Sequence, residues 1–226
     1  MRLSSPIKAV LFDLDDTLYD EMTFVASGFD AVANYLSTNF HLIEEEMFLS
    51  MMEVISKDGR GKVFDKVLEY SGLYNPKLVD ELVSVYRSHQ PNIDLYEDVI
   101  HIFQELRGLD IKLGIITDGL YSVQKNKVSS LGLQYLVDII IYTDEIGRKY
   151  WKPHPIAFQR AIEELAIEPY EAIYVGNDPT KDFAGPNSIG MRSVHLCKDR
   201  CLKESSCEAD IHIGSLNEII SALLNQ

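Results

Sequence analysis

Residues 7–19 read IKAVLFDLDDTLY, and this stretch decides the fold. Its first half is a short and nearly continuous apolar run, which is typical of a strand buried on both faces of a parallel sheet. Its second half places two carboxylates, Asp13 and Asp15, directly after that strand, and Thr17 follows them. The stretch therefore predicts a buried parallel strand that ends in a cluster of chemically active side chains.

Apolar runs of the same kind recur later in the chain and alternate with helical patterns. The further strands are expected over residues 112–117, 138–142, 172–175 and 192–196. The helices between and after them are expected over residues 97–109, 123–131, 155–165 and 215–224. This alternation predicts a doubly wound, Rossmann-like α/β fold with right-handed crossovers. Ligands of such sheets bind at the carboxyl ends of the strands.

Residues 19–92 interrupt the alternation, because they show helical periodicity and no convincing strand. Four helices are expected there, over residues 23–39, 44–56, 62–70 and 76–89. A segment this long cannot be an ordinary loop between a strand and a helix. We therefore expect a small all-helical cap domain, residues 19–92, inserted into a catalytic core of residues 1–18 and 93–226. Such an insertion would serve as a lid over the end of the first strand.

The charge of the chain excludes some classes of partner. Its 226 residues contain 21 Lys and Arg against 35 Asp and Glu, a formal net charge of −14. This balance argues against binding to nucleic acid or to an anionic membrane surface. No apolar run approaches the roughly 20 residues that a membrane helix needs. The expected protein is cytoplasmic and a monomer or weak homo-oligomer. A small phosphorylated metabolite stays compatible as its partner, since a bound cation can invert the local field.

The three cysteines all lie in one C-terminal stretch, at Cys197, Cys201 and Cys207. An odd number, gathered late in the chain, does not resemble a disulfide framework. A zinc site is weakly supported, because the stretch contains no C-x-x-C pair. We therefore expect reduced thiols here.

Asp13 and Asp15 are the strongest candidates for chemistry. Side chains two residues apart in an extended chain point the same way, so both carboxylates are expected to face one site. Two close carboxylates resist joint ionisation. The arrangement suits a shared cation, or an acid kept protonated for proton transfer. An isolated pair of this kind would as often be a helix cap or turn, but its place after a buried strand favours a site.

Three further segments carry polar residues that fit the same site. Thr117, Asp118 and Gly119 end the second strand, where a hydroxyl and approachable backbone N–H groups can cradle phosphate oxygens. Lys152 precedes a proline, which favours an extended backbone, and it would supply a fixed positive charge. The last segment reads VGNDPTKD, and its Asn177, Asp178 and Asp182 offer oxygen ligands for a hard cation. Each segment alone is also common in turns.

In this order the four segments resemble the haloacid dehalogenase superfamily. The motifs of that family are an Asp-x-Asp-x-Thr loop, a Thr or Ser at a strand end, a Lys, and an acidic strand end. The resemblance covers residue 7 to the C-terminus, and residues 19–92 look like the helical cap that the family inserts after its first motif. It implies a phosphoric monoester hydrolase that uses Mg²⁺ and acts on a small-molecule phosphate monoester through an aspartyl phosphate on Asp13.

The resemblance also implies a role for each matching position. Asp13 looks like the nucleophile, and Asp15 resembles the general acid and base. Thr117 and Lys152 look like phosphate ligands, assisted by the backbone N–H of Asp118. Thr17 and Gly119 would support the site.

The implied metal ligands are Asp13, the backbone carbonyl of Asp15, and an acidic residue of the fourth motif. Many family members have Asp directly after the glycine of that motif, where this chain has Asn177. Asp178 is therefore the expected third ligand, with the amide oxygen of Asn177 as the alternative. Asp182 would orient Lys152 or a metal-bound water.

Other functions stay open on the sequence. A phosphomutase would use the same aspartyl phosphate, and a non-catalytic binding module could use the same fold. A dehalogenase is disfavoured, because dehalogenases of this family lack an acid at the position of Asp15. Within the cap, residues 56–64 read SKDGRGKVF, and Arg60 and Lys62 there are candidates for contact with an anionic substrate. A solvated loop between helices is the alternative for that segment.

Overall fold

The structure is a computed structural model that describes residues 7–197 and 208–224, with side chains described up to residue 221. The chain divides into two compact units. Unit 1 combines Met1–Asp20 with Asp94–Gln226, and unit 2 is Glu21–Ile93. The segments that join them run side by side, because Tyr19 and Leu95 form an antiparallel bridge and Tyr96 N donates to Leu18 O at 2.9 Å.

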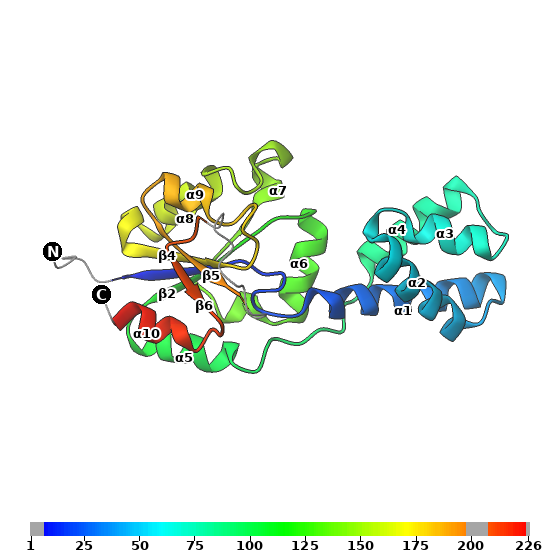
Figure 1. The fold of residues 1–226 in the computed structure, drawn as a ribbon, viewed down its shortest axis with the longest axis horizontal. Coiled ribbons are helices and arrows are strands. Elements are labelled where there is room, and N and C mark those ends of the chain that lie inside the picture. The colour runs from blue at the N-terminus through cyan, green and yellow to red at the C-terminus, as the bar shows by residue number, and fades with distance from the viewer. Residues whose placement is uncertain (1–6, 198–207, 225–226) are drawn as a thin grey trace. The chain divides into compact units, whose positions relative to one another are not determined.

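Unit 1 contains one parallel sheet of six strands in the order β3-β2-β1-β4-β5-β6 (Figure 1). This is the strand order of the doubly wound dinucleotide-binding fold. It confirms the predicted fold class. The strands are β1 (Ala9–Phe12), β2 (Lys112–Thr117), β3 (Ile139–Tyr142), β4 (Ala172–Gly176), β5 (Arg192–Leu196) and β6 (Ile211–Ile213).

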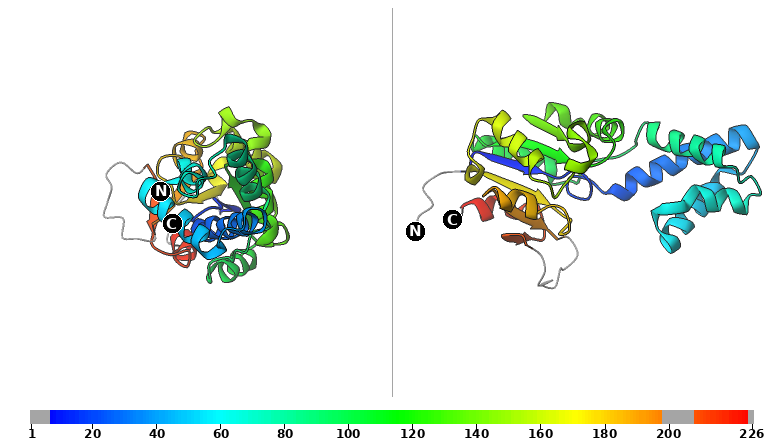
Figure 2. Two further views of the ribbon diagram at one scale, coloured as in Figure 1. Left: turned by 90° about the vertical axis from the view of Figure 1, so that its right-hand side faces the viewer. Right: turned by 90° about the horizontal axis from the view of Figure 1, so that it is seen from above.

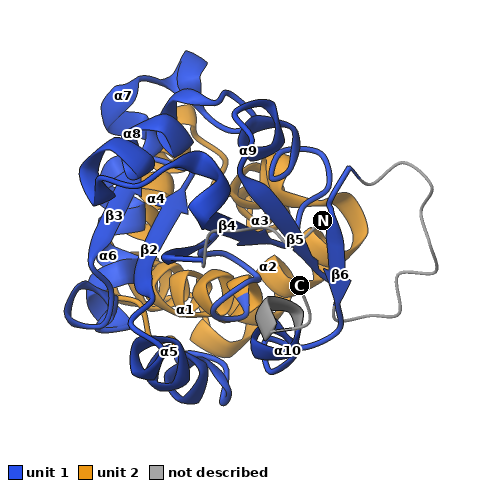
Figure 3. Cartoon of the chain, turned by 90° about the vertical axis from the view of Figure 1, so that its left-hand side faces the viewer, with its two compact units in different colours: residues 1–20, 94–226 blue, residues 21–93 orange. Residues whose placement is uncertain are grey.

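Helices cover both faces of this sheet, as Figure 3 shows, with α8 and α9 on one side and α5 and α10 on the other. On the first side the Phe158 ring of α8 meets the Tyr174 ring of β4 edge to face at 4.9 Å. On the second side Phe12 of β1 lies 5.3 Å from Phe103 of α5. The helices of unit 1 are α5 (Val99–Gly108), α6 (Tyr121–Ser130), α7 (Thr143–Ile146), α8 (Ile156–Leu165), α9 (Ala184–Ser188) and α10 (Glu218–Leu224), with 3-10 turns at Leu133–Tyr135, Arg148–Tyr150 and Pro169–Glu171.

Unit 2 is all-helical, and its chain runs from blue to cyan-green in Figure 2. Its helices are α1 (Glu21–Phe40), α2 (Glu44–Asp58), α3 (Val63–Tyr70) and α4 (Pro76–Ser88), with a 3-10 turn at Arg60–Lys62. Helix α4 begins with a standard signal, because the Asn75 side chain accepts a hydrogen bond from Lys77 N at 2.9 Å, and Pro76 has no N–H group that would need an acceptor.

Unit 2 has an apolar core of its own. Leu36 of α1, Met51 of α2, Leu68 of α3 and Leu82 of α4 are fully buried in it. Tyr86 stacks edge to face on Phe64, and its ring fills the space beside Gly28, where an added Cβ would lie 2.4 Å from a ring carbon. Four helices thus share one hydrophobic cluster that includes no residue of the sheet.

Unit 1 differs from the sequence-based expectations in its short elements and in one cysteine. Strand β6, a three-residue strand at the edge of the sheet that pairs with β5, was not expected from the sequence. The short helices α7 and α9 were not expected either. The expectation of reduced thiols is wrong for Cys197, which is disulfide-bonded. Cys201 and Cys207 lie outside the described residues. Within the described ranges no helix has the length and apolar character needed to span a bilayer.

Candidate active site

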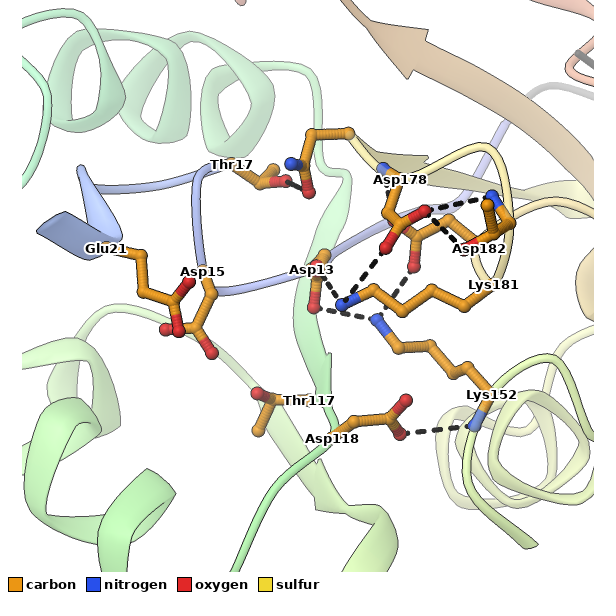
Figure 4. A network of polar contacts seen from close by, with 12 residues as sticks. Asp13, Asp15, Thr17, Glu21, Thr117, Asp118, Lys152, Asp178, Lys181 and Asp182 are labelled. Carbon is orange, nitrogen blue, oxygen red and sulfur yellow. Dashed lines mark hydrogen bonds and ion pairs between the residues drawn. The ribbon is translucent and has the colours of Figure 1, made fainter. Parts of the chain in front are cut away.

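The predicted site residues of unit 1 gather where β1, β2 and β4 end. Phe12 of β1 pairs with Ile115 of β2 and with Val175 of β4, so the residues that follow these strands emerge at one edge of the sheet. The chain reaches β2 and β3 on one side of β1 and reaches β4, β5 and β6 on the other. This reversal is the switch point at which doubly wound sheets bind ligands. Figure 4 shows the side chains that meet there.

Asp13 follows β1 and lies at the centre of the site, with only 1% of its surface exposed. Its Oδ1 accepts a hydrogen bond from Lys152 Nζ at 2.7 Å. Its Oδ2 is buried and has no hydrogen-bond partner among the described residues, although Lys181 Nζ lies 3.9 Å away. Burial raises the pKa of Asp13 to about 7, because the neighbouring Lys152 only partly offsets the loss of solvation.

Lys152 is the cation that organises this centre. Its fully buried Nζ donates to Asp13 Oδ1 at 2.7 Å, to the Tyr174 hydroxyl at 2.8 Å and to Asp182 Oδ1 at 2.8 Å. These three bonds use all the donors of an ammonium group. Burial alone would lower the pKa of Lys152, but the carboxylates of Asp13 and Asp182 raise it well above its usual value. Lys152 therefore carries a permanent positive charge beside Asp13.

Asp15 is held by three donors. Its Oδ1 accepts from Lys127 Nζ at 2.7 Å and from the Tyr19 hydroxyl, and its Oδ2 accepts from Gln124 Nε2 at 2.9 Å. The chain turns sharply after it, because Asp16 has a φ of 56°. Burial raises the pKa of Asp15, but Lys127 and the other donors outweigh this effect, so that its pKa lies below the usual value.

The end of β2 supplies Thr117, Asp118 and Gly119. Thr117 is buried, and its Oγ1 accepts from Gln124 Nε2 at 2.6 Å. Asp118 Oδ1 accepts from the Thr143 hydroxyl at 2.7 Å and from the backbone N of Lys152 at 3.2 Å. The Asp118 side chain thus fixes the backbone of the lysine segment to the end of β2.

The end of β4 supplies Asn177, Asp178 and Asp182. Asn177 Oδ1 accepts from the Thr17 hydroxyl at 3.4 Å. Asp178 Oδ1 accepts from the Thr180 hydroxyl at 2.6 Å, while Asp178 Oδ2 lies 3.9 Å from Lys181 Nζ. Asp182 is completely buried, and its Oδ1 lies 2.8 Å from Lys152 Nζ. That Asp182 orients Lys152 stays a prediction.

Comparison with known proteins identifies the family. Residues 10–196 match the haloacid dehalogenase-like hydrolase family. The chain belongs to this family. A glyceraldehyde 3-phosphate phosphatase of Methanocaldococcus jannaschii is 31% identical, over 97% of this chain and 98% of that protein. Another, of Methanopyrus kandleri, is 34% identical over 84% of each chain.

A solved relative agrees with these sequence matches. The crystal structure of a phosphatase of the same haloacid dehalogenase family from Thermococcus onnurineus aligns with a TM-score of 0.63 and 28% identity. The alignment covers 96% of this chain and 98% of that one. Together the matches confirm the predicted enzyme class, a haloacid dehalogenase-like phosphoric monoester hydrolase.

The donor set of this hydrolase fits a divalent cation. Asp13 Oδ2 is a buried carboxylate oxygen without a hydrogen bond among the described residues, and Asp178 Oδ2 lies at the same 3.9 Å from Lys181 Nζ. The described part of the chain contains no group of three or more His, Cys, Asp or Glu side chains that could hold a metal. A cation here would therefore need other oxygen ligands. Mg²⁺ is such a cation, since it keeps several waters and takes only one or two carboxylates.

The two cap candidates lie in unit 2 of this hydrolase. Both Arg60 guanidinium nitrogens donate to the Glu21 carboxylate, at 2.8 and 2.7 Å. Lys62 ends the same 3-10 turn and is exposed. Their contact with substrate stays a prediction.

Several residues of the candidate site were not expected from the sequence. Lys127 and Gln124 of α6 contact Asp15, Tyr174 of β4 contacts Lys152, and Lys181 lies near Asp13. The spacing of Gln124 and Lys127 was a usable signal, because residues three apart on a helix lie on the same face. The other two carry no local pattern that separates them from a core tyrosine and a surface lysine.

Proposed function

We propose that this hydrolase cleaves a small-molecule phosphate monoester through an aspartyl phosphate on Asp13, with Mg²⁺ as its cofactor. The observation that carries the proposal is the state of the Asp13 carboxylate. It is buried at the switch point of the sheet, with Oδ1 against the Lys152 ammonium and Oδ2 without a hydrogen bond among the described residues. In its ionised form, which Lys152 favours against burial, this carboxylate offers Oδ2 as a nucleophile.

In the first half-reaction an Asp13 oxygen attacks the phosphorus atom, and the bond from phosphorus to the ester oxygen breaks. The leaving alkoxide takes a proton from the Asp15 carboxyl group. The phosphoryl oxygens lie toward Thr117 and the backbone N–H of Asp118, while the Lys152 charge stabilises the negative charge that develops beside Asp13. The products are the alcohol and the aspartyl phosphate.

In the second half-reaction Asp15, now a carboxylate, removes a proton from a water molecule. That water attacks the phosphorus atom, the bond to Asp13 breaks, and inorganic phosphate is released. The lowered pKa of Asp15, caused chiefly by Lys127 acting against burial, favours the ionised form that this step needs. The acid role in the first half-reaction requires the same group to be protonated when the alkoxide leaves.

The residues that would hold Mg²⁺ are Asp13, the backbone carbonyl of Asp15, and Asp178, with the Asn177 amide oxygen as the alternative to Asp178. The cation would neutralise part of the charge of the phosphoryl group, so that one anion can approach another. Lys152 supplies a fixed positive charge of its own on the Oδ1 side of Asp13.

The substrate class follows from the relatives and from the charge of the protein. Two relatives are named glyceraldehyde 3-phosphate phosphatases. We propose a small phosphorylated metabolite of this kind as the substrate, with glyceraldehyde 3-phosphate as the first candidate. A net charge of −14 disfavours a polyanionic partner such as nucleic acid.

The test is release of inorganic phosphate from a panel of phosphorylated metabolites, with Mg²⁺ and with a chelator. We expect turnover that needs Mg²⁺ and that falls at least about 1,000-fold in Asp13→Asn, because a carboxamide is a poor nucleophile. Acid quenching during turnover should trap a phosphoprotein that hydroxylamine cleaves, as expected for an acyl phosphate.

Asp110→Asn is the matched control, because Asp110 is an exposed carboxylate of the same unit. It should retain wild-type turnover. Phosphate release that survives in Asp13→Asn would refute the aspartyl-phosphate route. Isomerisation of a sugar phosphate without net phosphate release would instead favour the phosphomutase.

A further inference from the structure

Helix α6 buries two polar side chains against the site. Gln124 is 2% exposed and Lys127 is 3% exposed, whereas Lys125 between them faces solvent. Positions three apart on a helix share a face, so α6 presents the amide and the ammonium together. Both side chains contact Asp15, which itself keeps 17% of its side-chain surface exposed. Asp15 is therefore open to substrate while its two partners are enclosed.

The two residues fix both oxygens of one carboxylate. Lys127 Nζ lies 2.7 Å from Asp15 Oδ1, where the Tyr19 hydroxyl also donates. The Lys127 ammonium is 6.0 Å from the centre of the Tyr19 ring, so the same tyrosine flanks it. With two donor groups on Oδ1 and one on Oδ2, rotation of the carboxylate about its Cβ–Cγ bond would break at least one hydrogen bond. The carboxylate plane is thus set by α6.

Gln124 also joins Asp15 to the end of β2. Its side-chain NH₂ group has two hydrogens, and it makes two bonds, to Asp15 Oδ2 at 2.9 Å and to Thr117 Oγ1 at 2.6 Å. Gly119 leaves the space that this requires, because a Cβ there would lie 3.0 Å from Gln124 Cδ and the backbone φ is +128°. One amide therefore fixes Asp15 relative to the proposed phosphate ligand Thr117.

Stability alone does not explain a buried lysine at position 127. Replacing a buried ion pair by apolar side chains of similar volume is often neutral or stabilising. Lys127 is only 3% exposed, so the argument applies to its position in α6. The charged pair is instead suited to holding a reacting carboxylate in one orientation.

We infer that Lys127 and Gln124 are positioning residues that hold the Asp15 carboxylate in line for proton transfer to and from the reacting oxygens. The inference rests on the proposed function, since it assigns the two residues to the acid–base group of that reaction. Neither residue touches the substrate phosphorus or Asp13 in this assignment. The effect of Lys127 is exerted through Asp15, so it falls on the proton-transfer steps and not on substrate binding. Gln124 also bonds Thr117, so its loss affects the proposed phosphate ligand as well.

The test compares two substrates that differ in whether the leaving group must be protonated by a general acid. An alkyl phosphate needs protonation of its leaving oxygen, whereas p-nitrophenyl phosphate releases a weakly basic phenolate without it. Both substrates share the second half-reaction, in which Asp15 acts as the base. In Lys127→Met and Gln124→Met we expect kcat for the alkyl phosphate to fall about 100-fold. In Lys127→Met, KM should change less than about threefold, whereas Gln124→Met also removes a hydrogen bond to Thr117 and should raise KM as well. With p-nitrophenyl phosphate, stopped-flow mixing should show a burst of one phenolate per active site, followed by slow turnover.

The controls separate positioning from folding. Lys125→Met removes an exposed lysine from the same helix and should leave both reactions unchanged. Lys127→Arg keeps a cationic donor and should recover part of the alkyl-phosphate rate. If one of the two methionine variants does not fold, as judged by circular dichroism, the other still decides the matter.

Three outcomes would overturn the inference. Rates within twofold of wild type in both methionine variants would show that Asp15 needs no such support. An equal fall for both substrates without a burst would show a general loss of structure. A wild-type protein that releases phosphate from neither substrate would overturn the proposed function as well, which distinguishes that failure from a failure of positioning alone.

Discussion

Burial of Asp13 opposes the negative charge that its proposed role requires. Burial raises its pKa from about 3.8 to about 7, so folding favours the protonated form. The stability that this group contributes is therefore fully present below its unfolded pKa and is lost as pH rises through about 7. A neutral Asn at this position should not show the loss. In chelator, Asp13→Asn should be more stable than the wild type at pH 8 by at least about 1 kcal/mol, and closer to it at pH 5.

Urea unfolding at the two pH values measures this difference. The exposed Asp110→Asn serves as the control and should follow the wild type at both. A gap between Asp13→Asn and wild type that is the same at pH 5 and pH 8 would show that Asp13 does not titrate in this range. Addition of Mg²⁺ should stabilise the wild type more than the variant, because only the wild type offers both carboxylates.

For single residues, the sequence predicts site residues that directly follow strands better than site residues that lie on helices. Asp13, Thr117 and Asn177 are found together because each directly follows or ends a buried strand, and parallel strands end at a common edge. Lys127 was not predicted from its residue type, because a lysine in a helix is ordinarily solvated, and only its spacing from Gln124 indicates a shared helix face. The contact of Lys127 with Asp15 depends on the turn at Asp16, and no local sequence pattern predicts the positive φ of that residue.

Helix α4 depends on a single side-chain cap at its first turn. Asn75 accepts from Lys77 N at 2.9 Å, and without it that backbone donor has no partner inside the helix. Asn75→Ala should therefore destabilise unit 2 by about 1 kcal/mol. Asn75→Ser keeps an oxygen at the same place and should cost less. Thermal unfolding of the wild type and the two variants measures the order of their stabilities. Equal stability of Asn75→Ala and Asn75→Ser would contradict the role of the Asn75 side chain as a helix cap.

The elements that were predicted from the sequence are those with a clear helical periodicity of apolar residues or with a continuous apolar run. The expected helix over residues 44–56 is found as α2 at Glu44–Asp58, and the expected strand over residues 192–196 is found as β5. The elements it missed are short. Strand β6 has three residues and an exposed centre, and α9 has five residues that include Pro186. Tertiary packing and not local pattern specifies segments of this length.

At the scale of the whole molecule, unit 2 has what a separate folding unit requires. Its four helices bury Leu36, Leu68 and Leu82 in a cluster made only of residues from the unit. Residues 21–93 expressed alone should therefore fold cooperatively, with a stability of at most about 5 kcal/mol, as is usual at this size. Circular dichroism and a dispersed NMR spectrum measure this directly.

Leu68→Ala is the matched variant for the fragment. It opens a cavity in the centre of the cluster and should cost about 2–5 kcal/mol, which is enough to unfold the fragment. An unfolded wild-type fragment would show that the helices depend on the sheet. A fragment that tolerates Leu68→Ala would show that its core is loosely packed.

The three hydrogen bonds of Lys152 have a consequence for how this protein can diverge. Its ammonium group donates to Asp13, Tyr174 and Asp182, which come from different parts of the chain. Loss of any one acceptor leaves a buried N–H unpaired, and loss of the lysine leaves buried acceptors without a donor. No member of this quartet can be replaced alone without cost. We expect descendants of a common ancestor to retain the four residues as a set or to lose them together, so that the set is inherited as one character.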